Sequence, residues 1–386
     1  MTSFDALGVA PALVKTLARD GIVAPFPIQA LTIPDALAGR DVLGKARTGS
    51  GKTLAFGVPL LERIDAGRPG RPTGLILVPT RELARQVFTV LVPLAKAAGR
   101  RVVSIYGGTE FDRDLKALRH GVDVVVATPG RLIDLVQRNA AALDGIQVAV
   151  VDEADRMNDM GFRPQVEWLL RRCPGRRQTL LFSATLDHDV ESLVRGFLRD
   201  PVRHEATTEP TIELMEHRFI AVHQMDKAKV TAAIAAHQGR TLVFVRTKRG
   251  ADRLMRQLDA EGVSVDAIHG DRTQGQREHA LKRFTDGRLS VLVATDVAAR
   301  GIHVDAIDVV VHYDPPEDAK AYTHRSGRTA RAGEAGLVVT LVLWDQILDV
   351  QRLQRQIGVG LPIVEMFSND PRLADLAAWD PATVAA

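Results

Sequence analysis

The sequence contains little of several residue types, and each shortage excludes a class of protein. Its 386 residues include one cysteine, Cys173, with no thiol or histidine at metal-ligand spacing. This excludes a disulfide framework and indicates a reducing compartment. Aromatic residues make up 5% of the chain, and no expected strand carries the row of exposed rings on which single-stranded bases stack. The net charge is only +3, so any site for a polyanion must come from local clustering of basic residues.

Long apolar runs are also missing. None approaches the ~18 residues that a membrane-spanning helix needs. The start of the chain lacks the basic and apolar regions of a signal peptide. We therefore expect a cytoplasmic protein that does not bind membranes.

Short β-type apolar runs alternate with helical patterns along the chain, which is typical of parallel α/β sheets. With 46% apolar residues, the chain is long enough for two cores of ordinary size. The expected strands form two series, at 74–78, 101–106, 122–127, 148–151 and 179–182, and at 241–245, 263–268, 291–294, 309–312 and 336–343. We predict an α/β fold with two tandem domains, each a parallel sheet with helices on both faces.

A polar, proline-bounded stretch between the two series has the composition of a linker. It places the domains at 1–205 and 218–365, with the linker at 206–217. Residues 366–386 are few and mildly acidic, so we expect a short acidic tail there.

A glycine-rich turn after an expected strand at 41–43 has the composition of a phosphate-binding loop. Its glycines allow main-chain N–H groups to converge on phosphate oxygens at the start of a helix. Lys52 adds a positive charge, and Thr53 adds a hydroxyl ligand for Mg²⁺. A surface turn is the alternative, because Ala46 stands where the strict pattern has glycine. The loop comprises Ala46, Arg47, Thr48, Gly49, Ser50, Gly51, Lys52 and Thr53.

An acidic quartet, residues 152–155, follows the apolar run at 148–151. Alone, such a quartet is typical of a solvated helix start. Together with the loop it predicts an ATP-hydrolysing site, because both motifs end expected parallel strands, where open α/β sheets bind their ligands. Asp152 would make the second protein contact to Mg²⁺, and Glu153 would position the attacking water.

Further motifs accompany the acidic quartet in a fixed order, and they are Pro79 to Ala84, Thr128 to Arg131, Ser183 to Thr185 and His324 to Arg331. This order resembles that of DEAD-box ATP-dependent RNA helicases of superfamily 2, of the bacterial minimal-core type, over roughly residues 4 to 345. The resemblance implies two RecA-like domains that close on ATP, Mg²⁺ and RNA, unwind short duplexes or remodel ribonucleoproteins, and reset on hydrolysis.

The resemblance also assigns an adenine-reading segment near residues 4–29. Gln29 would read the adenine edge with its amide, with Phe4 upstream. The alternative is that Phe4 is a core residue and Gln29 caps a helix. Ile22 replaces the aromatic residue that is usual in the family, and Phe26 replaces a small hydroxyl residue, so base stacking is left open.

In the second domain, the resemblance implies that Arg328 and Arg331 reach the γ-phosphate only when the domains close. Gly301 would contact the nucleotide. His303 stands where the family has an aspartate that accepts hydrogen bonds from the ribose. A neutral imidazole accepts one such bond and a protonated one accepts none. The alternative is that His303 packs at the edge of the cleft.

Two further sets of residues are implied by the resemblance. Hydroxyl groups that hydrogen-bond the acidic quartet, or cap a helix instead, would couple the two motifs, and the coupling set is Asp155, Ser183, Thr185, His324 and Arg325. An RNA track would follow the phosphate backbone without reading bases, with Asp271 recognising a 2′-OH. The track comprises Arg81, Gly107, Gly108, Thr128, Arg131, Thr247, Gly270, Asp271, Gln274, Arg277, Thr295 and Arg300.

Alternatives to a helicase remain at this point. One is an ATP-gated RNA clamp with little unwinding, and another is a DNA translocase. Structured or duplex RNA is the expected partner, and ribonucleoprotein or degradation complexes are candidate protein partners.

Overall fold

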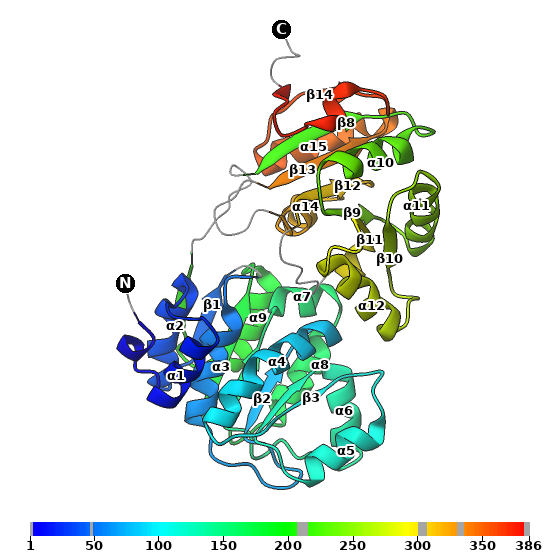
Figure 1. Ribbon diagram of the computed structural model, residues 1–386. Helices are drawn as coiled ribbons and strands as arrows, with labels where there is room; N and C mark the ends of the chain where they lie inside the picture. Colours follow the sequence, from blue (N-terminus) through cyan, green and yellow to red (C-terminus); the bar gives the residue numbers. More distant parts are fainter. Residues whose placement is uncertain (1–2, 47–48, 207–214, 300–306, 330–335, 382–386) are drawn as a thin grey trace. The chain divides into compact units, whose positions relative to one another are not determined.

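The computed structural model describes residues 3–46, 49–206, 215–299, 307–329 and 336–381. The chain divides into two units, Met1–Thr208 and Glu209–Ala386 (Figure 1). Residues 207–214, which make up most of the expected linker, lie outside the described ranges. Within those ranges, no helix combines the length and the apolar character needed to cross a membrane.

The first unit is built on seven parallel strands in the order β3-β4-β2-β5-β6-β1-β7. The strands are β1 (Val42–Lys45), β2 (Gly74–Leu77), β3 (Val102–Ile105), β4 (Val124–Ala127), β5 (Val148–Val151), β6 (Gln178–Ser183) and β7 (Val202–Glu205). The helices are the 3-10 turn η1 (Asp5–Leu7), α1 (Pro11–Arg19), α2 (Pro27–Leu37), α3 (Lys52–Arg63), α4 (Arg81–Ala97), α5 (Phe111–Arg119), α6 (Pro129–Gln137), α7 (Ala154–Asp159), α8 (Arg163–Arg171) and α9 (His188–Phe197).

Helices cover both faces of this sheet. Successive side chains along a strand point to opposite faces. In β5, Val148 and Val150 pack in a core with α1 to α4, whereas Ala149 and Val151 pack in a second core with α6 to α9. A strand buried on both faces reads as a continuous apolar run, which is why β5 could be predicted from sequence.

The second unit repeats this arrangement, with the parallel order β10-β11-β9-β12-β13-β8-β14. Counted along each unit, the strand order is the same in both sheets. The strands are β8 (Glu216–Ala221), β9 (Thr241–Val245), β10 (Val265–Ile268), β11 (Val291–Thr295), β12 (Val309–His312), β13 (Leu337–Val342) and β14 (Ile363–Glu365). The helices are α10 (Lys227–His237), α11 (Lys248–Ala260), α12 (Gln274–Thr285), α13 (Asp296–Ala299), α14 (Ala319–Ser326), α15 (Ile347–Ile357) and the 3-10 turns η3 (Trp344–Gln346) and η4 (Pro371–Ala374). The predicted fold class is confirmed.

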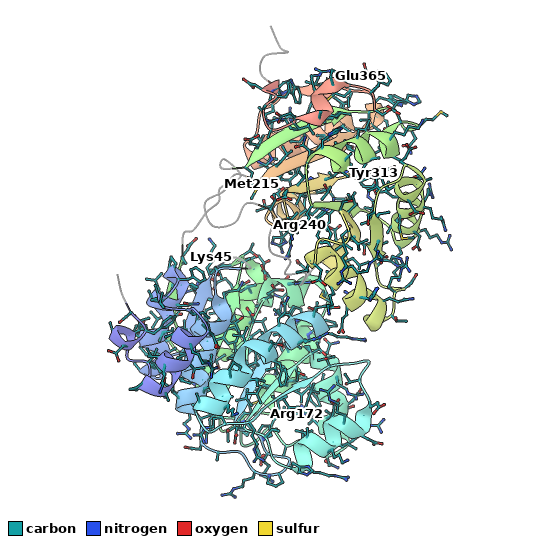
Figure 2. The ribbon with its side chains drawn as sticks, viewed as in Figure 1. Lys45, Arg172, Met215, Arg240, Tyr313 and Glu365 are labelled. Carbon is teal, nitrogen blue, oxygen red and sulfur yellow. The ribbon has the colours of Figure 1, made fainter. Side chains whose placement is uncertain are left out.

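Three strands, β7, β8 and β14, were not expected from sequence. β7 reads Val-Arg-His-Glu and pairs only with β1, so its residues alternate between half-buried and exposed. At its end, Glu205 forms an ion pair with Lys45, the last residue of β1 (Figure 2). The last two residues of the expected linker, 216 and 217, belong to β8.

The expected tail is a further correction. Met366, Leu373 and Leu376 are buried in the core that also contains α10 and α11. The guanidinium of Arg218 donates a 2.7 Å hydrogen bond to the Leu376 carbonyl. Residues 366 to 381 are therefore part of the folded second unit, and their acidic residues lie on its surface rather than in a separate tail.

Candidate nucleotide and RNA sites

The loop after β1 ends where α3 begins, at Lys52. Gly51 precedes the helix with φ +83°, and a Cβ there would lie 2.4 Å from the Gln29 amide nitrogen. Glycine is therefore required both by the backbone and by the packing. The Lys52 ammonium is buried and donates a 2.8 Å hydrogen bond to the Ala46 carbonyl, so the lysine spans the loop that it belongs to.

Other loop residues fall into two groups. Gly49 also has a positive φ, +88°, while Ser50 and Thr53 are half-buried. Arg47 and Thr48 lie outside the described residues. The described part of the loop thus has a buried cation and a helix N-terminus, the combination that binds phosphate.

Asp152 and Glu153 follow β5 and are both buried. Burial raises the pKa of Asp152 to about 7, although the nearby Lys52 charge opposes this shift. One Asp152 carboxylate oxygen accepts a 2.9 Å hydrogen bond from the Glu153 N–H. Glu153 has φ +53°, in the left-handed region that non-glycine residues seldom occupy, and its carboxylate forms an ion pair with Arg156 at 2.5 Å. The acidic motif is therefore held in a strained and specific conformation.

Asp155 links this motif to the end of β6. The N–H and the hydroxyl of Thr185 both donate to one Asp155 carboxylate oxygen, at 3.1 and 3.2 Å. The Asp155 N–H donates to the Ser183 hydroxyl at 3.2 Å, so this serine accepts from the backbone. The Ser183 carbonyl in turn accepts from the Ala46 N–H at 2.9 Å. These bonds connect the carboxyl ends of β1, β5 and β6 in one network.

In the segment near residues 4–29, Phe4 is 2% exposed and belongs to the core with α1 to α4. The assignment of this segment to adenine reading stays a prediction. The Gln29 amide oxygen accepts from the Phe26 N–H at 2.9 Å, and its nitrogen donates to the Gly51 carbonyl at 2.8 Å. Gln29 thus caps α2 and fixes the phosphate loop. Ile22 and Phe26 are exposed apolar side chains beside it in sequence.

Four of the five expected RNA residues of the first unit lie after neighbouring strands of the sheet, whereas the fifth, Arg131, forms an ion pair within the protein. The exposed Arg81 begins α4, and its guanidinium lies over Gly107 and Gly108, where an added Cβ would come within 3.3 and 2.4 Å of it. Thr128 precedes α6 and is half-buried. These four residues follow β2, β3 and β4, which are neighbours in the sheet.

The Arg131 guanidinium makes three contacts within the first unit. Its Nε donates to the Asp114 carboxylate at 2.8 Å, and its Nη2 donates to the Thr109 carbonyl at 3.1 Å. The guanidinium also lies 4.8 Å from the centroid of the Phe111 ring. The Asp114 side chain is 2% exposed and that of Arg131 is 12% exposed, so this ion pair holds α5 against α6. The assignment of Arg131 as a phosphate contact stays a prediction.

In the second unit, the expected RNA residues follow β9, β10 and β11, which are also adjacent. Thr247 caps α11 by accepting a 3.0 Å bond from the Gly250 N–H. The Lys248 ammonium donates to Asp271 at 2.6 Å and lowers the pKa of that exposed carboxyl. Gly270 follows β10, Gln274 begins α12, and buried Thr295 ends β11. The Arg277 guanidinium donates a 3.4 Å hydrogen bond to the Ala298 carbonyl. Arg300 lies outside the described residues.

Arg325 anchors α14. Two of its nitrogens donate to the Asp296 carboxylate at 2.6 and 2.7 Å, and a third donates to the Asp314 carbonyl at 2.7 Å. Arg328 follows one turn later and is 9% exposed, while His324 is half-buried. Arg331, Gly301 and His303 lie outside the described residues. The structure therefore shows how the helix before Arg328 is held.

The family models match both units. The DEAD/DEAH box helicase model matches residues 26–193, and the helicase conserved C-terminal domain matches residues 226–333. A solved structure of S. cerevisiae Dbp5 bound to RNA and ADP BeF3 is 30% identical, with a TM-score of 0.84, over 96% of this chain and 97% of that one. The chain belongs to the DEAD-box helicase family.

Curated relatives of this DEAD-box chain include bacterial RNA helicases. ATP-dependent RNA helicase CshA of Listeria monocytogenes is 42% identical over 89% of this chain and 66% of its own length. ATP-dependent RNA helicase RhlB of Xanthomonas campestris is 42% identical over 94% of this chain and 65% of its own length. The first eight such relatives are covered over 59 to 66% of their length.

The DEAD-box site also uses residues that sequence reasoning missed. Arg156 pairs with Glu153, and Lys248 pairs with Asp271. Each is a basic residue close in sequence to a motif, and this short separation could have identified it as a site residue. Tyr322 of α14 is a core residue rather than a site residue, and its hydroxyl lies 2.7 Å from the Nδ1 of His217.

Proposed function

We propose that this chain is an RNA-stimulated ATPase that separates short RNA duplexes or remodels RNA–protein complexes. The observation that supports this most directly is the network that joins Lys52, Asp152 and Asp155 to the end of β6. A buried lysine and a buried carboxylate at one end of a parallel sheet are suited to bind a metal–nucleotide complex. The relatives that share both units are named ATP-dependent RNA helicases.

In this proposal, Lys52 exchanges the Ala46 carbonyl for phosphate oxygens of ATP. Both acceptors are oxygen atoms, so a small shift of the ammonium group is sufficient. The N-terminus of α3 and the glycine N–H groups hold the same phosphates. Because Lys52 contacts the ground state, its loss should weaken ATP binding as well as hydrolysis.

Thr53 and Asp152 would hold Mg²⁺, which neutralises the developing charge on the phosphates. Mg²⁺ favours one or two carboxylate or hydroxyl oxygens, together with phosphates and water. The oxygen donors at this site fit that preference. A bound cation would also favour the ionised form of Asp152, whose pKa burial has raised to about 7.

Glu153 would orient the attacking water. Its carboxylate is paired with Arg156, and its backbone is strained. Release from Arg156 would place the carboxylate near the γ-phosphate. Arg328 and Arg331 of the second unit would supply positive charge to the transferring group when the units close on ATP and RNA. Arginines in this role contribute ~10³ to 10⁵ in rate in other NTPases.

RNA would bind along the residues that follow β2 to β4 and β9 to β11. Exposed Arg81 and the glycine N–H groups beside it are phosphate ligands, and the Lys248–Asp271 pair combines a phosphate contact with an acceptor for a 2′-OH. None of these groups distinguishes one base from another. We therefore propose sequence-independent binding of RNA.

The test is to measure ATP hydrolysis and strand separation with matched RNA and DNA of the same sequence. We expect RNA to stimulate hydrolysis, DNA to stimulate it poorly, and short RNA duplexes to separate only with hydrolysable ATP. Stimulation should also weaken steeply with salt, because the ligands contact phosphates. ATP-dependent RNA binding without turnover would instead support a clamp, and equal stimulation by DNA would support a translocase.

A further inference from the structure

The connections that lead from helices into strands in the first unit are rich in arginine. They lie at 38–41, 64–73, 98–101, 120–123, 138–147, 172–177 and 198–201. Together they contain ten arginines, no lysine and five aspartates, so their net charge is +5, whereas the whole chain carries only +3. The rest of the chain is therefore slightly acidic, and positive charge is concentrated in these connections.

All seven connections lie at the same edge of the sheet, because the strands are parallel and each connection precedes a strand. We call this set of connections the arginine edge. It is opposite to the carboxyl ends of the strands, where Lys52 and Asp152 lie. Figure 2 shows Lys45, the last residue of β1, at one end of the first unit and Arg172 toward the other. The strands are four to six residues long, so the two ends of the sheet are roughly 13 to 20 Å apart.

The five aspartates do not neutralise the arginine edge. Asp41 and Asp123 are buried, and their carboxylates accept hydrogen bonds of 2.6 to 2.7 Å from four main-chain N–H groups. Their charge thus serves to fix the connections. Asp65 and Asp144 are exposed, and each forms an ion pair with one arginine of the edge. With exposed Asp200 included, three carboxylates at the surface face a larger number of guanidinium groups.

Several exposed arginines of this edge have no carboxylate partner among the residues that the structure describes. They are Arg68, Arg101, Arg172 and Arg199 of the connections, together with Arg119 at the end of α5. Two main-chain contacts bring the first group of them together: the Arg101 guanidinium donates to the His120 carbonyl at 2.9 Å, and the Gly70 N–H donates to the Leu118 carbonyl at 2.9 Å. The connections before β2, β3 and β4 therefore meet, and they hold Arg68, Arg101 and Arg119 in one cluster.

Like charges also lie close together at the other end of this edge. Burial lowers the pKa of the Arg176 guanidinium, and the nearby charge of Arg199 lowers it further. Cations that are held near one another by short, fixed connections repel, and a bound polyanion would relieve this repulsion.

Aromatic rings at this edge are covered by guanidinium groups. The Arg172 guanidinium lies 3.3 Å from the centroid of the Trp168 ring, and those of Arg171 and Arg176 each lie 5.9 Å from the centroid of the Phe197 ring. The groups that this surface offers are therefore charged N–H donors, which suit phosphate oxygens and do not read bases.

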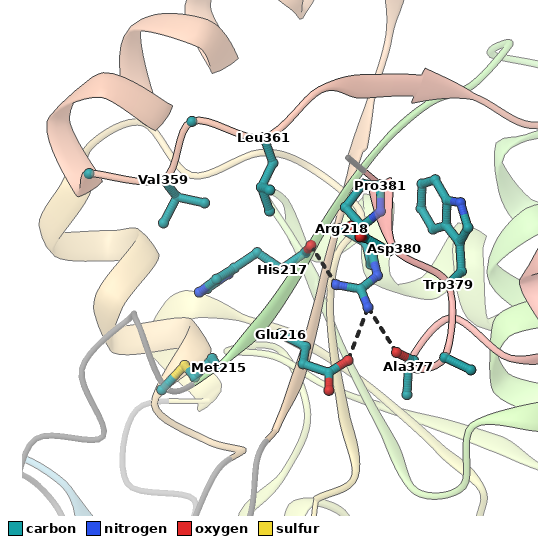
Figure 3. A pocket seen from close by; sticks show the side chains of 13 residues that line it. Met215, Glu216, His217, Arg218, Val359, Leu361, Ala377, Trp379, Asp380 and Pro381 are labelled. Carbon is teal, nitrogen blue, oxygen red and sulfur yellow. Dashed lines mark hydrogen bonds and ion pairs between the residues drawn. The ribbon is translucent and has the colours of Figure 1, made fainter. Parts of the chain in front are cut away.

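The corresponding edge of the second unit has no such surplus of charge. Its connections at 238–240, 261–264, 286–290 and 358–362, all within the described ranges, contain two arginines and two carboxylates. Figure 3 shows part of this edge, where a pocket of about 450 Å³ lies beside the start of β8 and the connection before β14. The Arg218 guanidinium there donates to the Glu216 carboxylate and to the Ala377 carbonyl, both at 3.0 Å. The arginine edge is thus a property of the first unit and not of the fold.

We infer that the arginine edge is a second RNA-binding surface of the first unit, which holds the phosphate backbone of a flank of the RNA. The inference rests on the proposed function only in taking RNA as the polyanion. The RNA residues that follow β2 to β4 lie at the opposite end of the sheet, so one RNA reaches both surfaces only if it is long enough to pass around the unit. Binding at either surface then raises the effective concentration of RNA at the other. The arginine edge should therefore strengthen the binding of long RNA and leave that of short RNA unchanged.

The test measures equilibrium binding of two kinds of RNA to the full chain. One is a single strand of roughly ten nucleotides, and the other is the same strand with a flank of about 20 base pairs, or with a single-stranded flank that has the same number of phosphates. In the triple variant Arg68→Gln, Arg101→Gln and Arg119→Gln, we expect flanked RNA to bind at least ~10-fold more weakly and short RNA to bind as it does to the parent. The slope of log Kd against log salt should decrease by about 2, because three phosphate contacts are lost. The arm with the larger loss identifies the flank as duplex or single-stranded.

Two further triple variants serve as controls. Lysine at the same three positions keeps the charge and should bind flanked RNA as the parent does, because a phosphate contact needs a cation and no fixed fork of donors. The second control removes the same charge from exposed sites of the second unit, by Arg256→Gln, Arg288→Gln and Arg355→Gln, and should bind flanked RNA nearly as the parent does. Unchanged circular dichroism would show that each variant is folded.

The inference is overturned if the glutamine variant binds flanked RNA as tightly as the parent, or loses no more affinity than the control in the second unit. Equal loss in the lysine variant would also overturn it, since the guanidinium groups would then act through packing. So would competition by polyglutamate that equals competition by RNA with the same number of charges, because an acidic protein would then be the occupant. Failure of RNA to stimulate hydrolysis by the parent would refute the proposed function, while the binding comparison would still test the arginine edge.

Discussion

Replacing Asp152 with asparagine should stabilise the ligand-free protein at neutral and alkaline pH while it abolishes hydrolysis. In the folded protein the carboxyl stays protonated up to its raised pKa of about 7, whereas in the unfolded chain it ionises near 3.8. Between these values the unfolded chain binds fewer protons, so stability falls as pH rises. Each pKa unit corresponds to about 1.4 kcal/mol, which gives a penalty of roughly 4 kcal/mol above pH 7. Asparagine cannot ionise, and its side-chain oxygen can still accept from the Glu153 N–H.

Urea unfolding between pH 5 and pH 9 is the assay. Trp168 reports on the first unit once Trp344 and Trp379 are replaced by phenylalanine. We expect Asp152→Asn to exceed the parent by roughly 2 to 4 kcal/mol at pH 8, and by less at pH 5. Asp134→Asn removes an exposed carboxylate from the same unit and should leave the pH dependence unchanged. If the parent and Asp152→Asn show the same pH dependence, the carboxyl does not titrate near neutral pH in the fold, and the argument from burial is refuted.

Four further outcomes can be checked. Lys52→Ala and Glu153→Gln should both abolish hydrolysis, but only Glu153→Gln should retain ATP affinity in equilibrium binding, because Lys52 holds the ground-state phosphates; equal loss of affinity would contradict these roles. Arg328→Ala should lower RNA-stimulated turnover at least ~10²-fold. Residues 1–205 alone should show almost no RNA-stimulated hydrolysis, and substantial activity of that fragment would exclude a two-unit mechanism. Arg131→Ala should destabilise the first unit by roughly 3 to 5 kcal/mol in urea unfolding, since it leaves the Asp114 carboxylate buried without its partner, and the double variant with Asp114→Asn should recover part of this loss. His303→Asp should lower the KM for ATP a few-fold with little change in kcat. It should also flatten the rise of this KM at acid pH, because a protonated imidazole accepts no hydrogen bond from the ribose. Identical KM profiles of the parent and the variant from about pH 5.5 to 8 would exclude this contact.

The sequence predicted the strands that are apolar runs well and the strands of mixed composition poorly. β5 and β12 are apolar runs buried on both faces, and such runs have few other structural interpretations. β7 and β14 lie at sheet edges, and β7 alternates polar and apolar residues, so neither has a distinctive composition. The segment after residue 366 looked like a tail because only a few spaced residues, such as Met366 and Leu376, are buried.

Candidate site residues could be predicted where the chemistry depends on a short, continuous sequence motif. The phosphate loop and the Asp155 contacts with Ser183 and Thr185 follow from motifs at the ends of strands. The ion pair of Arg131 could not be predicted, because its partner Asp114 comes from another helix, 17 residues earlier in the chain. Gln29 likewise has two possible uses for one amide, and the structure shows its contacts with Phe26 and Gly51.

The identical strand order of the two sheets suggests descent from a duplicated ancestor, and one pair of residues supports this. Lys227 is the first residue of α10, as Lys52 is of α3, and it lies 3.8 Å from Asp314, which follows β12 as Asp152 follows β5. The second unit thus has a lysine–aspartate pair, with the Lys227 side chain 2% and the Asp314 side chain 29% exposed, in the place where we propose that Lys52 and Asp152 bind ATP in the first unit. The turn before Lys227, residues 222–226, contains no glycine, so it cannot form the same phosphate cradle. The second unit therefore has the two charges without the glycine turn that, in our proposal, holds the phosphates of ATP in the first unit.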